Sequence, residues 1–219
     1  ENSVGGITVP LLQTASGQKI GKSAGNAVFL DPEITNDYDL YQWFLRATDA
    51  DVEKFLKIFT LMDENKIETI VKQHEEKPEK RVAQIALAQE AVSFLRGQEA
   101  VKRAEFASEI LFGKHNLKEM SFDQISDALS CFPTTTLPLS GVVGVGLPKL
   151  LASVGLCPSI SAARRAIKSG GVSLNQETVA RDEGSNLTIE ENNLIFGGRL
   201  VYLGVGKKEK CFVLVEERC

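Results

Sequence analysis

The chain has 219 residues, 43% of them hydrophobic, which is enough to fill the cores of one large or two small domains. No apolar run approaches the roughly 20 residues needed to cross a bilayer, so we expect no membrane partner. The net charge of −4 argues against an unfocused nucleic-acid binder, although residues 136–219 hold ten basic against eight acidic side chains.

The cysteines are scattered and form no Cys-x-x-Cys pair, which excludes a zinc site or a disulfide framework as the organising feature of the fold. We therefore expect a reducing compartment and no protein-bound metal. The four positions are Cys131, Cys157, Cys211 and Cys219.

Lysine, glycine and serine residues gather near the start of the chain in a pattern suited to phosphate binding. Gly21 and Gly25 have no Cβ, so the backbone can approach a ligand closely. Lys19 and Lys22 supply ammonium charges, and Ser23 supplies a hydroxyl donor. Together these groups could hold the triphosphate of ATP.

The same residues fit two other structures, a P-loop and a solvated turn. A P-loop would require glycine in place of Ser16 and a helix starting directly on the Lys-Ser pair, whereas residues 24–26 make a poor first helical turn. We therefore reject a P-loop. The other interpretation is a solvated turn that follows an apolar strand at residues 7–12.

Helical periodicity dominates residues 36–130. Asn36 or Asp37 can cap a first helix, and Asp49 can cap a second, each with apolar side chains on one face. Both helices are expected to face a core.

Further helices are predicted beyond the first two. An acidic helix is expected at residues 63–75, an alanine-rich helix ending at Gly97, and another ending at Gly113. Residues 121–124 have the spacing of a capping box, which predicts one more helix start at Ser121.

Residues 131–146 have the composition of a linker, being rich in proline, threonine and glycine. The order Gly141-x-x-Gly144-x-Gly146 differs from the dinucleotide-binding order Gly-x-Gly-x-x-Gly, so no cofactor is expected there.

The pattern then changes to two short helices followed by strands. The first helix ends at Gly155, and Ser161 is predicted to cap the second. A strand at residues 171–174 is expected to turn at Asn175-Gln176 and return along residues 177–179. Further strands are predicted at residues 187–189, 200–203 and 212–215.

The run Lys19-Ile20-Gly21-Lys22-Ser23, with the helical segments that follow it, resembles the KMSKS loop of bacterial-type tyrosyl-tRNA synthetases, the form of bacteria and organelles. Ile replaces Met, and Gly replaces the first Ser, as is usual in the tyrosine enzymes. The resemblance implies ATP binding by Lys19, Gly21, Lys22 and Ser23, and a catalytic role for Lys19, Lys22 and Ser23.

The pattern from Ser161 to Asn175, with two arginines on a helix and a Gly-Gly turn before a strand, resembles the alpha-L RNA-binding motif. Three cations on one helix can track RNA phosphates. The alternative is that Arg164 and Arg165 only form salt bridges with Asp182 or Glu183. The RNA-binding residues implied are Ser161, Arg164, Arg165, Lys168, Gly170, Asn175, Lys207 and Lys208.

These resemblances imply an α+β chain in four parts. The parts are the end of a Rossmann-like class I catalytic domain (1–35), an all-helical domain for the anticodon arm (36–130), a linker (131–146) and a small alpha-L RNA-binding domain (147–219). Neither His74 nor His115 lies in a His-x-Gly-His signature. We therefore expect the C-terminal part of a longer enzyme, inactive by itself.

The implied function is tyrosine activation by ATP, with Mg²⁺ carried by the nucleotide, and transfer to tRNA(Tyr), the tyrosine pocket lying in the missing domain. The whole enzyme is expected to be a homodimer of the mitochondrial matrix, with bacterial cytoplasm or plastid as alternatives. The other function class left open is a non-catalytic RNA-binding module with a vestigial phosphate loop.

Overall fold

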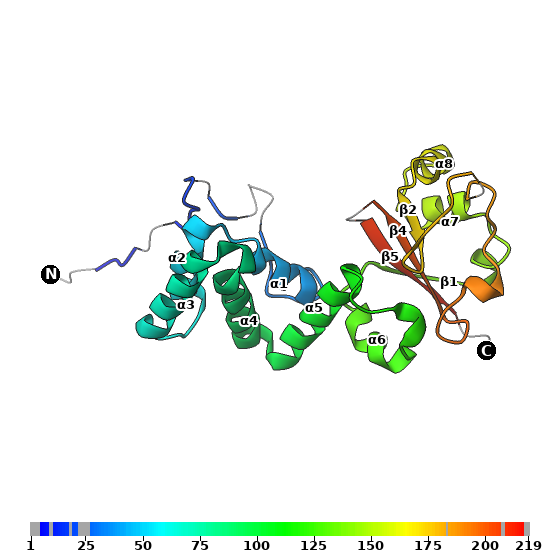
Figure 1. Cartoon of the computed structure of the whole chain (residues 1–219). Coiled ribbons are helices and arrows are strands. Elements are labelled where there is room, and N and C mark those ends of the chain that lie inside the picture. Colours follow the sequence, from blue (N-terminus) through cyan, green and yellow to red (C-terminus); the bar gives the residue numbers. More distant parts are fainter. Residues whose placement is uncertain are drawn as a thin grey trace. The chain divides into compact units, whose positions relative to one another are not determined.

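The computed structural model describes residues 5–8, 11–17, 19–21, 27–182, 184–206 and 209–216. These residues form an α+β structure that divides into two compact units, Glu1–Lys102 and Arg103–Cys219 (Figure 1). None of the helices in the described ranges is long and apolar enough to span a bilayer. The described residues at 7, 8, 11 and 12 belong to no strand, so the strand predicted at 7–12 is wrong there.

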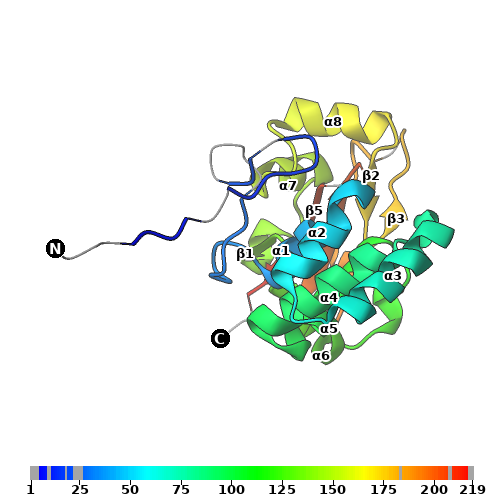
Figure 2. The same ribbon diagram turned by 90° about the vertical axis from the view of Figure 1, so that its left-hand side faces the viewer.

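The first unit is helical. It contains α1 (Asp37–Leu45), α2 (Asp49–Phe59), α3 (Glu64–Glu76), a 3₁₀ turn at Pro78–Lys80 and α4 (Val82–Arg96). Helix α4 packs against each of the other three, which Figure 2 shows gathered around it. The helices predicted at residues 63–75 and up to Gly97 are thereby confirmed.

Small side chains and aromatic rings share the core of this unit. Alanines at 83, 88 and 91 of α4 are fully buried, so the neighbouring helices can approach its backbone closely. The rings of Phe44 and Phe59 lie edge to face, with centroids 5.3 Å apart, where α1 meets α2. The core faces predicted for the first two helices are therefore confirmed.

The caps of the first two helices differ. Asn36 caps α1 as predicted, since its side chain accepts a hydrogen bond from the Asp39 amide. The prediction that Asp49 caps α2 is wrong, because Thr48 holds the extended N-cap position and Asp49 is the first helical residue. Sequence alone does not separate two adjacent residues that can both cap a helix.

Asp49 instead joins a polar network with buried His74. Its Oδ1 lies 2.9 Å from His74 Nε2 and accepts a hydrogen bond from Gln84 Nε2 at 2.6 Å. The hydrogen bond with His74, then the one with Gln84, lowers the pKa of the Asp49 carboxyl below its usual value.

This pKa shift predicts an acid-dependent loss of stability. A carboxyl whose pKa is depressed in the folded state contributes stability at pH above its unfolded pKa and loses it as the pH falls through the folded value. We expect Asp49→Asn to reduce the dependence of the unfolding temperature on pH below about pH 4. Thermal melts from pH 7 to pH 3 measure it, and equal slopes for both proteins would contradict the assignment.

The second unit begins within α5 (Gln98–Leu111), which is followed by a 3₁₀ turn at Leu117–Glu119 and by α6 (Phe122–Leu129). Ser121 and Gln124 form both hydrogen bonds of a capping box, which confirms the predicted helix start. The remainder of the unit is a five-stranded sheet with two helices.

The sheet has the strand order β1-β5-β4-β2-β3. Strand β1 pairs in parallel with β5, and the other neighbours are antiparallel. The strands are β1 (Thr134–Leu137), β2 (Val172–Leu174), β3 (Glu177–Thr178), β4 (Leu200–Val205) and β5 (Glu209–Val215).

The segment predicted to be a linker, residues 131–146, is not free chain. Its threonine run forms β1, whose residues from Thr134 to Leu137 pair with Phe212 to Val215. Three β-branched threonines favour an extended backbone, which the linker interpretation overlooked. The segment therefore completes the sheet of the second unit, and the domain boundaries drawn from the sequence stay a prediction.

Helices α7 (Leu147–Ser153) and α8 (Ile160–Lys168) pack on one face of the sheet. Leu150 and Ile167 meet Val213 of β5 in one fully buried cluster. The prediction that Ser161 caps α8 is wrong. Ser159 is the N-cap, and its hydroxyl accepts a hydrogen bond from the Ala162 amide at 3.1 Å.

The strands predicted at 200–203 and 212–215 are confirmed as β4 and β5. The strand predicted at 187–189 is wrong, since this segment forms a single bridge between Thr188 and Gly146. The turn predicted at Asn175-Gln176 is confirmed, with φ of +48° and +70° at its two residues.

Gln176 docks this turn on the end of α5 and on the residues that follow it. Its side-chain amide donates to the carbonyls of Ile110 and His115, and its side-chain oxygen accepts from the Leu117 amide. These bonds group residues 103–130 with the sheet, whereas the sequence placed them with the preceding helices.

Candidate functional site

The predicted phosphate loop begins at the end of a small hairpin. We define the hairpin as residues 12–20, with Gln18 outside the described residues. Gln13 and Lys19 form an antiparallel bridge, and the Ile20 amide donates to the Leu12 carbonyl at 3.2 Å. Gly17 closes the turn at φ +78°, a left-handed conformation that glycine adopts without a Cβ clash. Lys19 therefore lies at the end of the hairpin, and it is exposed.

Two side chains of α2 hold this hairpin. Asp51 is 3% exposed; its Oδ1 accepts from the Ala15 amide at 2.6 Å and its Oδ2 from the Thr48 hydroxyl at 2.7 Å. One helical turn further on, Lys54 Nζ donates to the Gln13 carbonyl at 2.7 Å. We call these two contacts to the hairpin the clamp.

The segment that follows the loop is held by Arg96 of α4. Arg96 pairs with Asp37 at 3.0 Å, and both side chains are largely buried. Its Nη2 also donates to the carbonyls of Phe29, Leu30 and Thr35. Residues 29–35 are thus fixed to the helical unit through their backbone.

Part of the predicted ATP set falls within the described residues. Lys19 and Gly21 stand two residues apart where the hairpin ends, and Gly21 has φ +157°. Lys22 and Ser23 lie outside the described residues. No group of three or more His, Cys, Asp or Glu side chains suited to a metal ion occurs within the described ranges.

The predicted RNA face lies on α8 in the second unit. Ser161, Arg164, Arg165 and Lys168 are all exposed on this helix. Among the residues that the structure describes, Asp182 forms no ion pair with Arg164 or Arg165, while Glu183 lies outside them. The salt-bridge alternative therefore gains no support from Asp182, and the arginines remain available to a partner.

Arg181 is a candidate RNA-binding residue that the sequence did not indicate. Its guanidinium lies over Gly170, since a Cβ built on that glycine would come within 2.7 Å of Arg181 Nε. The two residues are brought together by the return of the chain along β3. The Gly-Gly turn was a signal for close approach, but nothing in the sequence names the side chain that fills the space.

The packing of Arg181 on Gly170 predicts a measurable effect of adding a methyl group. Gly170→Ala should destabilise the protein by about 1–2 kcal/mol, because φ is +77° there, and should also displace Arg181 and weaken RNA binding. Gly155→Ala is the matched control, with the same φ and open space around the new Cβ. Equal RNA affinity in the two variants would contradict the role of Arg181.

The side chain of Asn175 supports the β2–β3 turn. It is 7% exposed; its Oδ1 accepts from the Tyr202 amide and its Nδ2 donates to the Asn193 carbonyl. These bonds position the β2–β3 turn, and the RNA-binding role of Asn175 stays a prediction. Lys207 and Lys208 lie outside the described residues.

Lys210 is the described lysine nearest to those two. Its Nζ lies 6.0 Å from the centroid of the Tyr202 ring, and burial lowers its pKa. Its stem lies against Gly204, where a Cβ would clash with it. The missing side chain at Gly204 thus leaves room for the half-buried Lys210 on the sheet.

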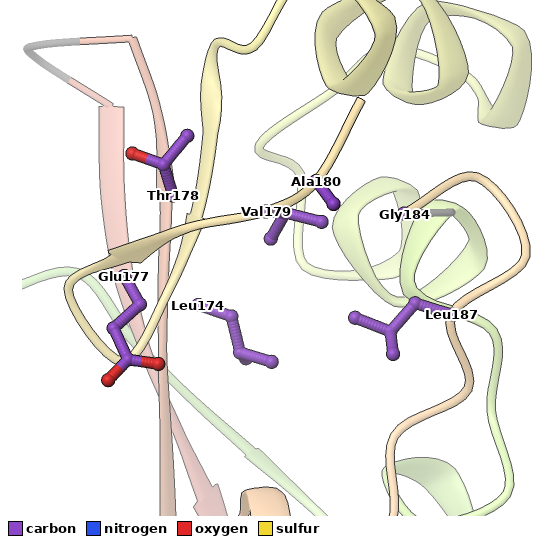
Figure 3. Close-up of a pocket in the computed structure, with 7 residues that line it drawn as sticks. All are labelled: Leu174, Glu177, Thr178, Val179, Ala180, Gly184 and Leu187. Carbon is purple, nitrogen blue, oxygen red and sulfur yellow. The ribbon is translucent and has the colours of Figure 1, made fainter. Parts of the chain in front are cut away.

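A small apolar cavity of about 170 Å³ lies beside β3. Figure 3 shows the side chains of Leu174, Val179 and Leu187 turned toward the same space. The cavity is below the roughly 300 Å³ at which ligand pockets begin, so it is not a site for ATP or tyrosine.

Comparison with known proteins covers both units. Residues 1–113 match the family model described as tRNA synthetases class I (W and Y), and residues 145–185 match the S4 domain. A tyrosine–tRNA ligase 2 of Bacillus cereus is 37% identical over 97% of this chain and 49% of its own length. The mitochondrial tyrosine–tRNA ligase of Saccharomyces cerevisiae is 40% identical over 95% of this chain and 41% of its own length.

Among solved structures, a C-terminally truncated mitochondrial tyrosyl-tRNA synthetase of Coccidioides posadasii shares 45% identity. The match covers 45% of this chain and 25% of that one, with a TM-score of 0.39, and carries no structural argument here. The chain spans about half the length of the curated relatives it matches.

Proposed function

Because this chain belongs to the family of class I tRNA synthetases (W and Y), we propose that it is the C-terminal part of a tyrosine–tRNA ligase. The curated relatives that it matches along nearly its whole length are named as tyrosine–tRNA ligases. The observation that carries the proposal is the hairpin anchored on α2, together with the sequence Lys19-Ile20-Gly21-Lys22-Ser23 that begins within it.

The proposed reaction has two steps. A carboxylate oxygen of tyrosine attacks the α-phosphorus of ATP, forming tyrosyl-adenylate and releasing pyrophosphate. A terminal ribose hydroxyl of tRNA(Tyr) then attacks the tyrosyl carbonyl carbon and releases AMP. Lys19 and Lys22 offset the phosphate charge that develops as pyrophosphate leaves, Gly21 allows close approach, and Ser23 donates a hydrogen bond.

Mg²⁺ accompanies ATP in this proposal and is carried by the nucleotide, where it neutralises phosphate charge. Tyrosine itself binds in the half of the protein that this chain does not span. The chain alone is therefore expected to be inactive in aminoacylation.

The second unit supplies the RNA contacts. Arg164, Arg165 and Lys168 of α8 are exposed cations that can follow the phosphates of tRNA, and Arg181 extends the same set at Gly170. The match to the S4 domain over residues 145–185 supports this assignment. The helical segment 36–130 is proposed to receive the anticodon arm.

The substrate test uses the full-length protein and ATP–pyrophosphate exchange. We expect exchange that depends on tyrosine and exceeds exchange with tryptophan by at least 100-fold. Exchange driven by tryptophan instead would replace the proposed substrate within the same family. No exchange with either amino acid would favour the non-catalytic RNA-binding module.

The RNA interface predicts a salt effect. Arg164→Ala with Arg165→Ala should weaken tRNA binding and reduce the slope of log K against log salt by about 1 for each lost phosphate contact. Filter binding between about 50 and 200 mM salt measures the slope. Lys102→Ala, which removes an exposed lysine of the helical segment paired with Glu99, is measured beside it to show how much that segment adds to the slope. An unchanged slope in the arginine variant would remove α8 from the interface.

The relatives matched include both a mitochondrial and bacterial tyrosine–tRNA ligases. We propose the mitochondrial matrix as the compartment, with bacterial cytoplasm or plastid as alternatives. A homodimer formed by the full-length protein completes the proposal.

A further inference from the structure

Asp51 and Lys54 bind the hairpin from the same side of α2. The two residues are three apart in an α-helix, so their side chains leave neighbouring positions on one helix face. Asp51 reaches the Ala15 amide, 36 residues earlier in the chain, and Lys54 reaches the Gln13 carbonyl. Both contacts are made to backbone atoms, so they fix the path of the chain whatever side chains it carries.

Asp51 is also held rigidly. It is 3% exposed, and its second oxygen is occupied by the Thr48 hydroxyl of the same helical turn. Because both oxygens have partners, the carboxylate is fixed in the orientation that receives the Ala15 amide. The hairpin therefore rests on a side chain that has little freedom to move.

The position of the clamp in the chain links it to the phosphate loop. The Gln13 carbonyl belongs to the residue that bridges to Lys19, and Ile20 bonds to the neighbouring Leu12. A displacement of Gln13 or Ala15 is thus transmitted through one bridge to Lys19. Misplacement of a charged donor by about 1 Å can cost two orders of magnitude in rate.

We propose that Asp51 and Lys54 are positioning residues for the adenylation step, holding the hairpin so that Lys19 and the residues after it meet the ATP phosphates. This inference rests on the proposed function. It adds two residues of the helical unit that touch neither ATP nor tRNA and act through the backbone of residues 13 and 15.

The first test is kinetic and uses the full-length protein. Asp51→Ala removes both hydrogen bonds and should lower kcat/KM for ATP in tyrosine-dependent exchange roughly tenfold. The KM for tyrosine should stay within twofold, because the clamp is on the ATP side only. A merely structural role would change the kinetic constants for ATP and for tyrosine together.

Two variants separate the hydrogen bonds from other effects of the substitution. Asp51→Asn keeps an acceptor for the Ala15 amide and a partner for Thr48, so its ATP kinetics should stay within about threefold of wild type. Glu53→Ala, an exposed neighbour on α2 paired only with Lys57 in the described structure, should have no effect. A fall in Asp51→Asn as large as in Asp51→Ala would overturn the inference.

A second readout does not depend on activity. The Ala15 amide should exchange with deuterium at least tenfold faster in Asp51→Ala than in wild type, while amides in α4 keep their protection. If Asp51→Ala does not fold, Lys54→Met replaces it, with an expected fall of about threefold in kcat/KM for ATP. Unchanged ATP kinetics and Ala15 protection would overturn the inference.

The outcomes also distinguish this inference from the proposed function. If the wild-type protein shows no tyrosine-dependent ATP–pyrophosphate exchange, the proposed function is contradicted. Deuterium exchange of the Ala15 amide then still tests the clamp. If Lys22→Ala slows ATP–pyrophosphate exchange and Asp51→Ala does not, only the positioning role is contradicted.

Discussion

Replacing Lys22 with alanine is expected to slow tyrosine-dependent ATP–pyrophosphate exchange by roughly 10²-fold or more in the full-length protein. Its ammonium is proposed to offset charge on the phosphates as pyrophosphate leaves, and one preorganised charge donor of this kind contributes about that factor. The loss should fall mainly on kcat, because the stabilised charge develops in the transition state.

Two controls support the interpretation of that result. Lys22→Arg keeps the charge but changes its shape, so it should recover part of the rate. Lys57→Ala removes an exposed lysine of α2 whose partner is Glu53 four residues earlier, and exchange should stay within twofold of wild type. An unchanged rate in Lys22→Ala would contradict the catalytic role proposed for Lys22.

Local signals in the sequence were sufficient for most of the helices. The capping box at Ser121 and the glycine that ends α4 each depend on residues within one turn, so they can be interpreted without the fold. The errors at helix starts arose where two residues close in sequence can both cap the helix, as with Thr48 and Asp49 or Ser159 and Ser161.

Contacts between distant segments could not be predicted in this way. From the sequence, Asp51 is an ordinary acidic residue in the first turn of a helix, where its charge interacts favourably with the helix dipole. Its bond to Ala15 exists only because the fold returns α2 to a segment 36 residues earlier. The same holds for Arg181 on Gly170, and for the threonines of β1, which required β5 as a partner.

Arg96 and the clamp hold the chain on either side of the predicted phosphate loop. The clamp holds residues 13 and 15 before the loop, and Arg96 holds the carbonyls of residues 29, 30 and 35 after it. In sequence, Lys19 and Lys22 therefore fall between two segments that are held on one helical unit.

Arg96→Ala is accordingly expected to destabilise this unit strongly. It leaves the Asp37 carboxylate, which is largely buried, without its arginine, and removes a donor from three carbonyls. Breaking a buried pair in this way costs about 3–5 kcal/mol. Urea unfolding of the chain measures the loss.

The matched control is Lys66→Ala, which breaks an exposed pair with Glu90 on the same helix as Arg96 and should cost less than about 1 kcal/mol. Arg96→Lys should fall between the two, because lysine keeps the charge but cannot reach Asp37 and the carbonyls together. If Arg96→Ala costs no more than Lys66→Ala, Arg96 does not fix residues 29–35, and only the clamp would remain to position the loop.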